Sequence, residues 1–311
     1  MKKTLVTMTA LAAFAVTTTL AIAQDTTSMF QRLDRDNDGF VELDGLSEGL
    51  RVRIKRLDAN NDGRISSDEA SIARKTAKNK ARAKGGAQTN PTIADIAYSD
   101  AFDRSKLDIW LPEDASGEAP IVVFFHGGGF VGGDKRRIKL REFVNLPKRG
   151  VAFASVNYPL KRDIKADSAW GHLPTVFAET QKSLDFIRSK ADEWGIDPER
   201  IVLAGSSAGT VISQYLAYAK NEDVEAVLAL QTPYGIELVI DELSSGAPEM
   251  FFYTLSGPTD KTHHPSYAQE LYDQCEKVGM ECHLYGSRVS GLPQLKAGET
   301  IVDVVAKQLN W

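Results

Sequence analysis

A serine flanked by small residues is the first feature of this chain that could do chemistry. Ser207 lies at the centre of the segment 205–209, Gly-Ser-Ser-Ala-Gly, directly after the apolar run 201–204. A buried strand that is followed by a sharp turn and a helix exposes the side chain at the turn, where serine can act as a nucleophile. The spacing therefore predicts a nucleophilic Ser207 on a strand–turn–helix elbow.

A glycine run supplies a matching electrostatic element. The segment 126–129, His-Gly-Gly-Gly, follows the apolar run 121–125. Such a loop brings backbone amides to a carbonyl oxygen that becomes negative, and glycine permits the close approach. We predict an oxyanion hole made by the amides of Gly127, Gly128 and Ala208, in which the histidine of the run orients the loop.

Short apolar runs alternate with helical stretches from about residue 92 onwards, and these elements must position the two motifs. Strands are expected near 107–111, 120–125, 151–157, 201–204, 225–230, 250–256 and 281–285, and helices near 175–194, 207–220, 266–278 and 297–309. Alternation of this kind predicts an α/β fold, with a mainly parallel sheet, helices on both faces and a site at the carboxyl ends of the strands.

Several motifs occur in one order along the segment 92–311. They are Lys106–Pro112 (KLDIWLP), His126–Phe130 (HGGGF), Gly133–Lys135 (GDK), Val156–Tyr158 (VNY), Gly195–Ile201 (GIDPERI) and the elbow at Ser207. With these motifs the segment resembles the α/β-hydrolase carboxylesterases, in the branch shared by hormone-sensitive-lipase-like and bacterial feruloyl-esterase-like enzymes. The resemblance implies an α/β-hydrolase fold and a serine carboxylic-ester hydrolase that needs no cofactor for catalysis.

The resemblance also suggests positions for the acid and the base. Asp260 stands at the family's acid position, but the family's His-Gly step aligns with Ser290-Gly291, so the usual base is absent. Three explanations are open. His263 or His264, just beyond Asp260, acts as a relocated base; the site lacks a base and turns over slowly; or the pocket has become a binding site.

A separate pattern of oxygen-bearing residues precedes the hydrolase-like segment. The twelve residues 58–69 fit an EF-hand loop throughout, with a glycine at the turn. The expected calcium ligands are Asp58, Asn60, Asp62, the Arg64 carbonyl, Ser66 and Glu69. We therefore predict Ca²⁺ binding in this loop.

A second, weaker EF-hand loop begins at Asp34. Its ligands would be Asp34, Asp36, Asp38, the Phe40 carbonyl and Glu42. Gly45 stands where the closing glutamate is needed, so this loop should bind Ca²⁺ poorly or serve mainly to pair with its neighbour. Residues 26–72 are thus expected to form a small all-α EF-hand pair, which resembles the tandem EF-hands of bacterial exported proteins.

The N-terminal segment 1–23 has the pattern of a signal peptide. Lys2 and Lys3 precede a mostly apolar stretch, and Ala21-Ile22-Ala23 gives a small-residue cleavage site. We expect an exported protein, periplasmic or extracellular and without a stable membrane anchor; a retained anchor is the alternative. In that compartment Cys275 and Cys282 could form a disulfide, or they could be two buried thiols.

The net charge of the chain narrows the possible partners. The net charge of −5 becomes −7 once the two lysines of the leader are removed, which argues against nucleic acid as a partner.

Residues 73–91 are expected to form a basic linker. The short segment between the strands 225–230 and 250–256 leaves room only for a small cap over the site. The expected partner is a small-molecule or glycan-linked ester. The alternatives are a catalytically degenerate hydrolase that binds a ligand and a calcium-dependent interaction protein.

Overall fold

The computed structural model describes residues 33–34, 38–46, 51, 54–58, 62–66, 90–113 and 119–311. The chain divides into two compact units, Met1–Gln88 and Thr89–Trp311, and each is described by itself. The predicted signal peptide 1–23 lies outside the described residues, as does nearly all of the predicted linker 73–91.

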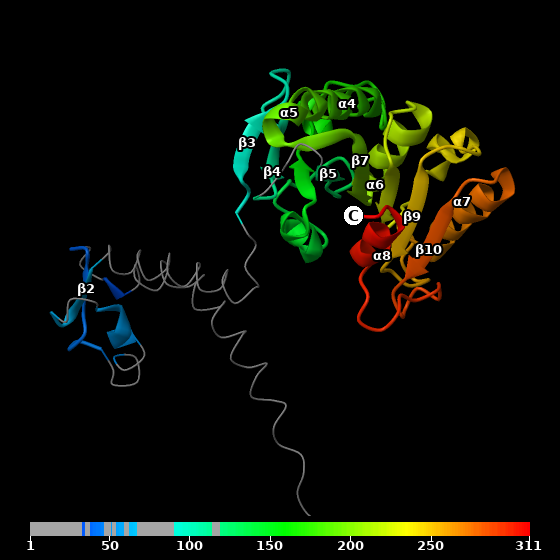
Figure 1. The fold of residues 1–311 in the computed structure, drawn as a ribbon. Helices are drawn as coiled ribbons and strands as arrows, with labels where there is room; N and C mark the ends of the chain where they lie inside the picture. Colours follow the sequence, from blue (N-terminus) through cyan, green and yellow to red (C-terminus); the bar gives the residue numbers. More distant parts are fainter. Residues whose placement is uncertain are drawn as a thin grey trace, which may run out of the picture. The chain divides into compact units, whose positions relative to one another are not determined.

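A mixed eight-stranded sheet forms the centre of the larger unit (Figure 1). The strands are β3 (Ile93–Ala97), β4 (Lys106–Trp110), β5 (Ala119–Phe125), β6 (Ala152–Val156), β7 (Ile196–Ser206), β8 (Ala226–Leu230), β9 (Glu249–Thr254) and β10 (Cys282–Gly286). Their spatial order is β10-β9-β8-β7-β5-β6-β4-β3. All neighbours from β6 to β10 are parallel, whereas β4 is antiparallel to β6 and β3 to β4. This mostly parallel sheet confirms the predicted α/β-hydrolase class.

Helices cover both faces of the sheet (Figure 1). One face packs against α4 (Leu173–Ser189), α5 (Ala191–Trp194), α6 (Ala208–Gln214) and α7 (Pro265–Val278). The other packs against η2 (Arg141–Arg149) and α8 (Ile301–Gln308). The shorter helical turns are η3 (Lys161–Asp163), η4 (Tyr215–Ala219), η5 (Ile236–Leu238) and η6 (Ile240–Glu242).

The central strand β5 shows why continuous apolar runs form this sheet. Ile121, Val123 and Phe125 belong to the core under α4, α6 and α7, while Val122 and Phe124 belong to the core under α8. A strand covered on both faces needs apolar side chains at successive positions. Because the strands from β6 to β10 are parallel, their carboxyl ends meet at one edge, where the functional loops emerge.

The smaller unit contains a short antiparallel pair. Strand β1 (Phe40–Glu42) pairs with β2 (Arg64–Ser66), with Val41 opposite Ile65, and η1 (Lys55–Leu57) precedes β2. Val41, Leu43, Ile54 and Ile65 form a small buried core. Val41 and Ile65 occupy the same position of the two predicted twelve-residue loops, so the loops pair side by side. This pair of strands was not predicted from the sequence.

A disulfide joins α7 to β10 in the larger unit. Cys275 and Cys282 are bonded, with their Cα atoms 6.4 Å apart. Of the two states considered for these cysteines, the structure contains the bridge.

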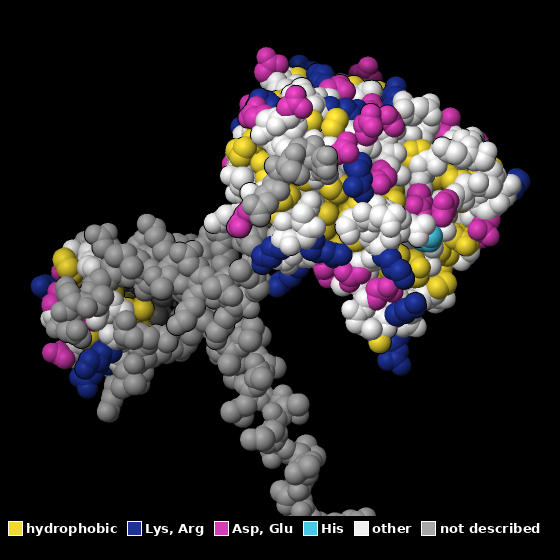
Figure 2. Space-filling model, in the orientation of Figure 1, with side chains coloured by type: hydrophobic (Ala, Val, Ile, Leu, Met, Phe, Trp, Pro, Cys, Tyr) yellow, Lys and Arg dark blue, Asp and Glu magenta, His cyan; other side chains and the backbone are white. Residues whose placement is uncertain are grey.

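The surface of the larger unit carries acidic and basic side chains interspersed, as its visible face in Figure 2 shows. Within the described ranges, no helix is both long and apolar enough to cross a membrane.

Candidate active site

The elbow that holds Ser207 is a strained turn between β7 and α6. Ser207 has φ 56° and ψ −118°, a backbone conformation that non-glycine residues rarely adopt and that persists only where the surroundings impose it. A Cβ on Gly205 would lie 2.0 Å from the Gly209 carbonyl oxygen, and a Cβ on Gly209 would lie 1.9 Å from that of Phe125. Both glycines are therefore needed for the turn that presents Ser207.

An imidazole lies between Ser207 and Asp260. His263 Nε2 is 2.8 Å from Ser207 Oγ, and His263 Nδ1 is 3.2 Å from Asp260 Oδ2. Asp260 and His263 both belong to the loop between β9 and α7. A single loop thus brings a carboxylate and an imidazole into line with the serine.

The second histidine of this loop has a different role. His264 is the N-cap of α7, and its Nδ1 accepts a hydrogen bond of 3.1 Å from the Ser266 amide. Of the two candidate bases, the structure brings only His263 to Ser207 and Asp260.

Ser290, which aligns with the family's usual base, closes a turn. It is buried, its Oγ donates to the Ser287 carbonyl at 2.7 Å, and it accepts from the Leu292 amide at 3.2 Å. A Cβ on Gly286 would lie only 2.1 Å from Ser290 Oγ. This position is occupied by a compact hydrogen-bonded turn.

Asp260 is surrounded by donors. The Ser256 hydroxyl donates to its Oδ2 at 2.6 Å, and the amides of Thr262 and His263 donate to its Oδ1 at 2.9 and 3.0 Å. The bond from the Ser256 hydroxyl has the largest effect, and together these bonds hold the pKa of Asp260 well below its usual range. Asp260 is therefore an anion that can pair with an imidazolium.

Gln231 supports the acid loop from the neighbouring strand. Its Nε2 donates to Ser256 Oγ at 2.8 Å, and its Oε1 accepts from the amides of Ser256, at 3.1 Å, and Leu255. Gln231 follows β8 directly and has φ 59°. The sequence did not reveal Gln231 or Ser256 as site residues; the only signal was a polar residue at the carboxyl end of each strand.

The glycine loop lies directly against the elbow. A Cβ on Gly127 would lie 2.8 Å from the Ser206 carbonyl oxygen and 3.3 Å from Ser207 Cβ. Gly128 has φ 133°, and Ala208 is the first residue of α6. The three residues predicted to supply oxyanion-hole amides thus come from two segments that meet at Ser207.

His126 fixes the start of this loop as a neutral ring. Burial lowers its pKa to about 4. Its Nδ1 donates to the Gly127 carbonyl at 2.9 Å, and its Nε2 accepts from Arg104 at 3.3 Å. Its ring stacks on Tyr158, whose hydroxyl donates to the His126 carbonyl at 2.6 Å. Arg104 also donates to the carbonyls of Gly133 and Tyr158, a role that the sequence did not predict.

In the smaller unit, the two predicted loops fold in the same way around their first aspartate. Asp58 accepts from the amides of Asp62 and Gly63 at 3.2 and 3.1 Å, and Asp34 accepts from those of Asp38 and Gly39 at 3.1 and 3.2 Å. Gly39 and Gly63 both have φ 85°.

The described donor set of both loops is rich in oxygen, which suits Ca²⁺. It consists of Asp34, Asp38, Phe40, Glu42, Asp58, Asp62, Arg64 and Ser66. The other predicted ligands, Asp36, Asn60 and Glu69, lie outside the described residues.

Two family models match the chain. The model of the BD-FAE family matches residues 107–266, which include the glycine loop, the elbow and the loop of His263. A model described as EF hand matches residues 51–69, which include the second loop.

Other proteins are similar to part of the chain. A probable isoprenylcysteine alpha-carbonyl methylesterase of Arabidopsis thaliana is 26% identical over 164 residues, 48% of this chain and 33% of the relative. A probable carboxylic ester hydrolase, LipM, of Mycobacterium tuberculosis is 28% identical over 130 residues, 41% of this chain and 28% of the relative. The chain thus spans about a third or less of the length of these relatives.

Solved structures share the fold. A thermophilic esterase of Thermogutta terrifontis with propionate bound superposes with a TM-score of 0.53 at 18% identity, covering 73% of this chain and 93% of the esterase. A truncated carbohydrate esterase from gut microbiota gives 0.53 at 16% identity, covering 65% and 89%.

Proposed function

This chain belongs to the BD-FAE family, and on that premise we propose that it is a serine carboxylic-ester hydrolase. Ser207 is the nucleophile, His263 the general base and Asp260 the acid that orients the base. The observation that carries the proposal is the contact of 2.8 Å between His263 Nε2 and Ser207 Oγ, with Asp260 on the other ring nitrogen.

The chemistry follows from these positions. Ser207 Oγ attacks the ester carbonyl carbon as His263 Nε2 takes its proton, and Asp260 stabilises the imidazolium that forms. Amides of Gly127, Gly128 and Ala208 stabilise the negative oxygen, and each such donor is typically worth about 3–4 kcal/mol of barrier. His263 then protonates the leaving alcohol, and water hydrolyses the acyl-enzyme by the same steps.

The substrate in this proposal is a small-molecule ester or an ester carried on a glycan. Between β8 and β9 the chain forms only η5 and η6, each of three residues, so this segment adds no long cap helix at the carboxyl edge of the sheet. Tyr234 and Leu238 in the same segment are exposed. A short cover is compatible with a bulky alcohol group.

The smaller unit, in the same proposal, binds Ca²⁺ through its EF-hand motif. The match over 51–69 and the shared geometry of the two loops support this assignment. When bound, the ion neutralises the clustered carboxylates of the loops.

The proposal also includes export of the protein. The residue pattern of 1–23 supports it, and so does the disulfide between Cys275 and Cys282, because disulfides persist mainly in oxidising compartments.

The test of the proposed activity is hydrolysis of short p-nitrophenyl esters, together with labelling by a fluorophosphonate. Wild type should hydrolyse the esters and take up the label at Ser207. Ser207→Ala should lose both properties, while the neighbouring Ser206→Ala should still be labelled. A wild type that neither turns over any ester nor reacts with the probe would contradict the proposal and favour a ligand-binding protein.

A further inference from the structure

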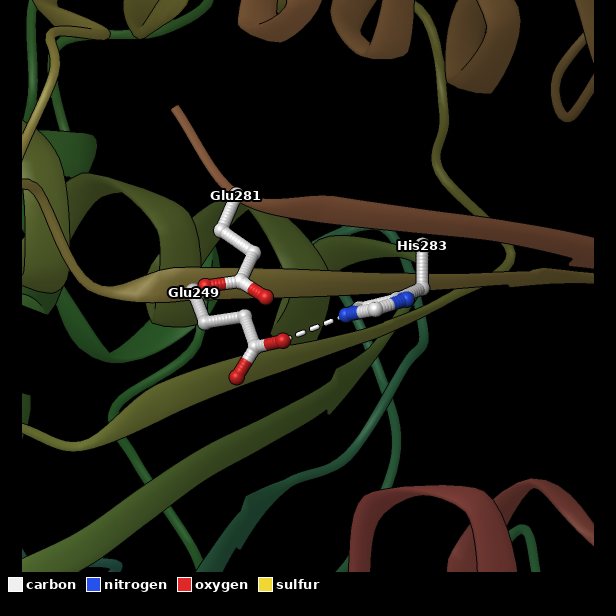
Figure 3. Close-up of side chains that lie close together, drawn as sticks. All are labelled: Glu249, Glu281 and His283. Carbon is white, nitrogen blue, oxygen red and sulfur yellow. Dashed lines mark hydrogen bonds and ion pairs between the residues drawn. The ribbon is translucent and has the colours of Figure 1, made fainter. Parts of the chain in front are cut away.

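The opposite end of the sheet carries a second group of ligating side chains. Glu249 begins β9, Glu281 immediately precedes β10, and His283 lies within β10. Figure 3 shows their side chains pointing toward one another, and one ligand atom from each lies within 4.8 Å of the other two. Since the loop of Asp260 follows the carboxyl end of β9, this cluster lies at the other end of that strand.

The parallel register explains the convergence. His283 pairs with Phe251, so Glu281 is level with Glu249, and the Met250 amide donates to the Glu281 carbonyl at 3.1 Å. Residues two apart on a strand share a face, which places Glu281 and His283 on the same side of β10. The His283 ring stacks on Phe251 at 4.7 Å, on the face of the sheet that α8 covers.

The electrostatics of the cluster favour a cation. Two carboxylates directly opposite on neighbouring strands repel each other. The side chain of Glu249 is only 12% exposed and that of His283 24% exposed, so solvent screens this pair weakly. A divalent ion would neutralise both carboxylates.

We propose that Glu249, Glu281 and His283 form a binding site for a divalent transition-metal ion, for which Zn²⁺ is the best fit. One imidazole nitrogen and two carboxylate oxygens are donors that suit Zn²⁺, whereas Ca²⁺ and Mg²⁺ prefer oxygen alone. Zinc–ligand distances of about 2.0–2.2 Å place ligand atoms about 3.3–3.6 Å apart in a tetrahedron. To bind the ion, the hydrogen-bonded pair of His283 Nε2 and Glu249 would open to that separation, and the exposed Glu281 side chain would rotate to bring its oxygen to the same distance.

Gln308, which is not one of the three ligands, orients Glu281, and the bound ion would link two strands. Gln308, at the end of α8, donates to Glu281 Oε1 at 3.1 Å, which is how partners outside the ligand set usually fix a ligand. The ion would tie the edge strand β10 to β9. It therefore stabilises the folded chain and takes no part in the chemistry at Ser207.

The experiment titrates ZnCl₂ into the full chain after chelator treatment, with Ca²⁺ present at saturation, and follows heat release and thermal unfolding. Wild type should bind one Zn²⁺ at the cluster, and the bound ion should raise the temperature at which the chain unfolds. Glu281→Gln and His283→Asn should lose this binding, and Gln308→Ala should weaken it by roughly 10–100-fold. Glu270→Gln, an exposed change on α7, is the matched control and should bind as wild type does.

Because Glu281 is exposed, Glu281→Gln should fold and keep its ester hydrolysis, which separates this site from the proposed activity. Zn²⁺ binding of equal strength in wild type and Glu281→Gln would overturn the proposal, as would no binding by wild type. An equal response to Mg²⁺ would overturn the assignment to a transition metal.

Discussion

The imidazole beside Ser207 comes from the acid's own loop, three residues after Asp260. In the sequence, His263 and His264 both follow Asp260 closely. The backbone geometry decides which of the two faces Ser207. Pro265 opens α7 and requires an extended residue before it, so His264 adopts φ −60° and ψ 135° and caps the helix. His263, one residue earlier, is left facing Ser207. This choice depends on a helix boundary, which a pattern of residues locates poorly.

His126 gives the first prediction at the residue scale. Burial lowers its pKa to about 4, against about 6.5 in an unfolded chain, so the unfolded state takes up the proton first as the pH falls. The buried, neutral His126 contributes its full stabilisation of the fold above about pH 6.5. That contribution is lost as the pH falls to about 4, and the free energy of unfolding then decreases by about 3 kcal/mol in all. Urea unfolding at pH 7 and pH 4 should show this loss in wild type.

The control is His126→Asn, which has no imidazole to titrate. It should lose less free energy of unfolding than wild type over the same pH interval. An identical loss in the two proteins would show that His126 does not contribute to it.

At the element scale, the elbow and the glycine loop could be predicted because most of their glycines mark places where no Cβ fits. The contacts that hold these elements could not be predicted. Arg104 reaches His126, and Gln231 reaches Ser256, across distances in sequence that no local pattern encodes. The sequence therefore pointed to Ser207 and to the amides beside it, while the residues that position them needed the structure.

The glycine loop gives the second prediction. In Gly127→Ala the new Cβ would lie 2.8 Å from the Ser206 carbonyl oxygen and would push the loop away from the elbow. Displacing an oxyanion-hole donor should lower kcat by roughly 10²–10³-fold, with the fold retained. Steady-state kinetics and circular dichroism measure the two effects.

Gly132→Ala is the matched change in the same loop, because no other atom lies within 4 Å of the position that its new methyl group would take. It should keep most of the activity. Equal rates for Gly127→Ala and wild type would exclude Gly127 from the oxyanion hole.

At the scale of the whole molecule, the sequence predicted the parallel strands and their flanking helices well, because strands covered on both faces are continuous apolar runs. It missed β3, where each residue is exposed or only half-buried, since a sheet edge carries little hydrophobic signal. It left open that the two loops pair with each other, but it did not predict the three-residue strands β1 and β2 that join them.

The third prediction concerns the smaller unit, for which we propose calcium binding. In the sequence, Glu69 stands at the closing position of the second loop, whereas the first loop has Gly45 there. Glu69→Gln should therefore abolish most Ca²⁺ binding to the full chain, and Glu42→Gln should have the smaller effect. Modules of this class outside the cell bind at roughly 10⁻⁴–10⁻³ M, which calorimetry can measure. Two equally tight sites in wild type would contradict the interpretation of Gly45.

The most direct test of the central claim compares His263→Ala with His264→Ala in ester hydrolysis. His263→Ala removes the group that contacts both Ser207 and Asp260, so kcat should fall by roughly 10²–10⁴-fold, and added imidazole should restore part of the rate. His264→Ala removes only a helix cap and should retain nearly all of the rate. A His263→Ala variant as active as wild type, or an equal loss in His264→Ala, would contradict the assignment of His263 as the base.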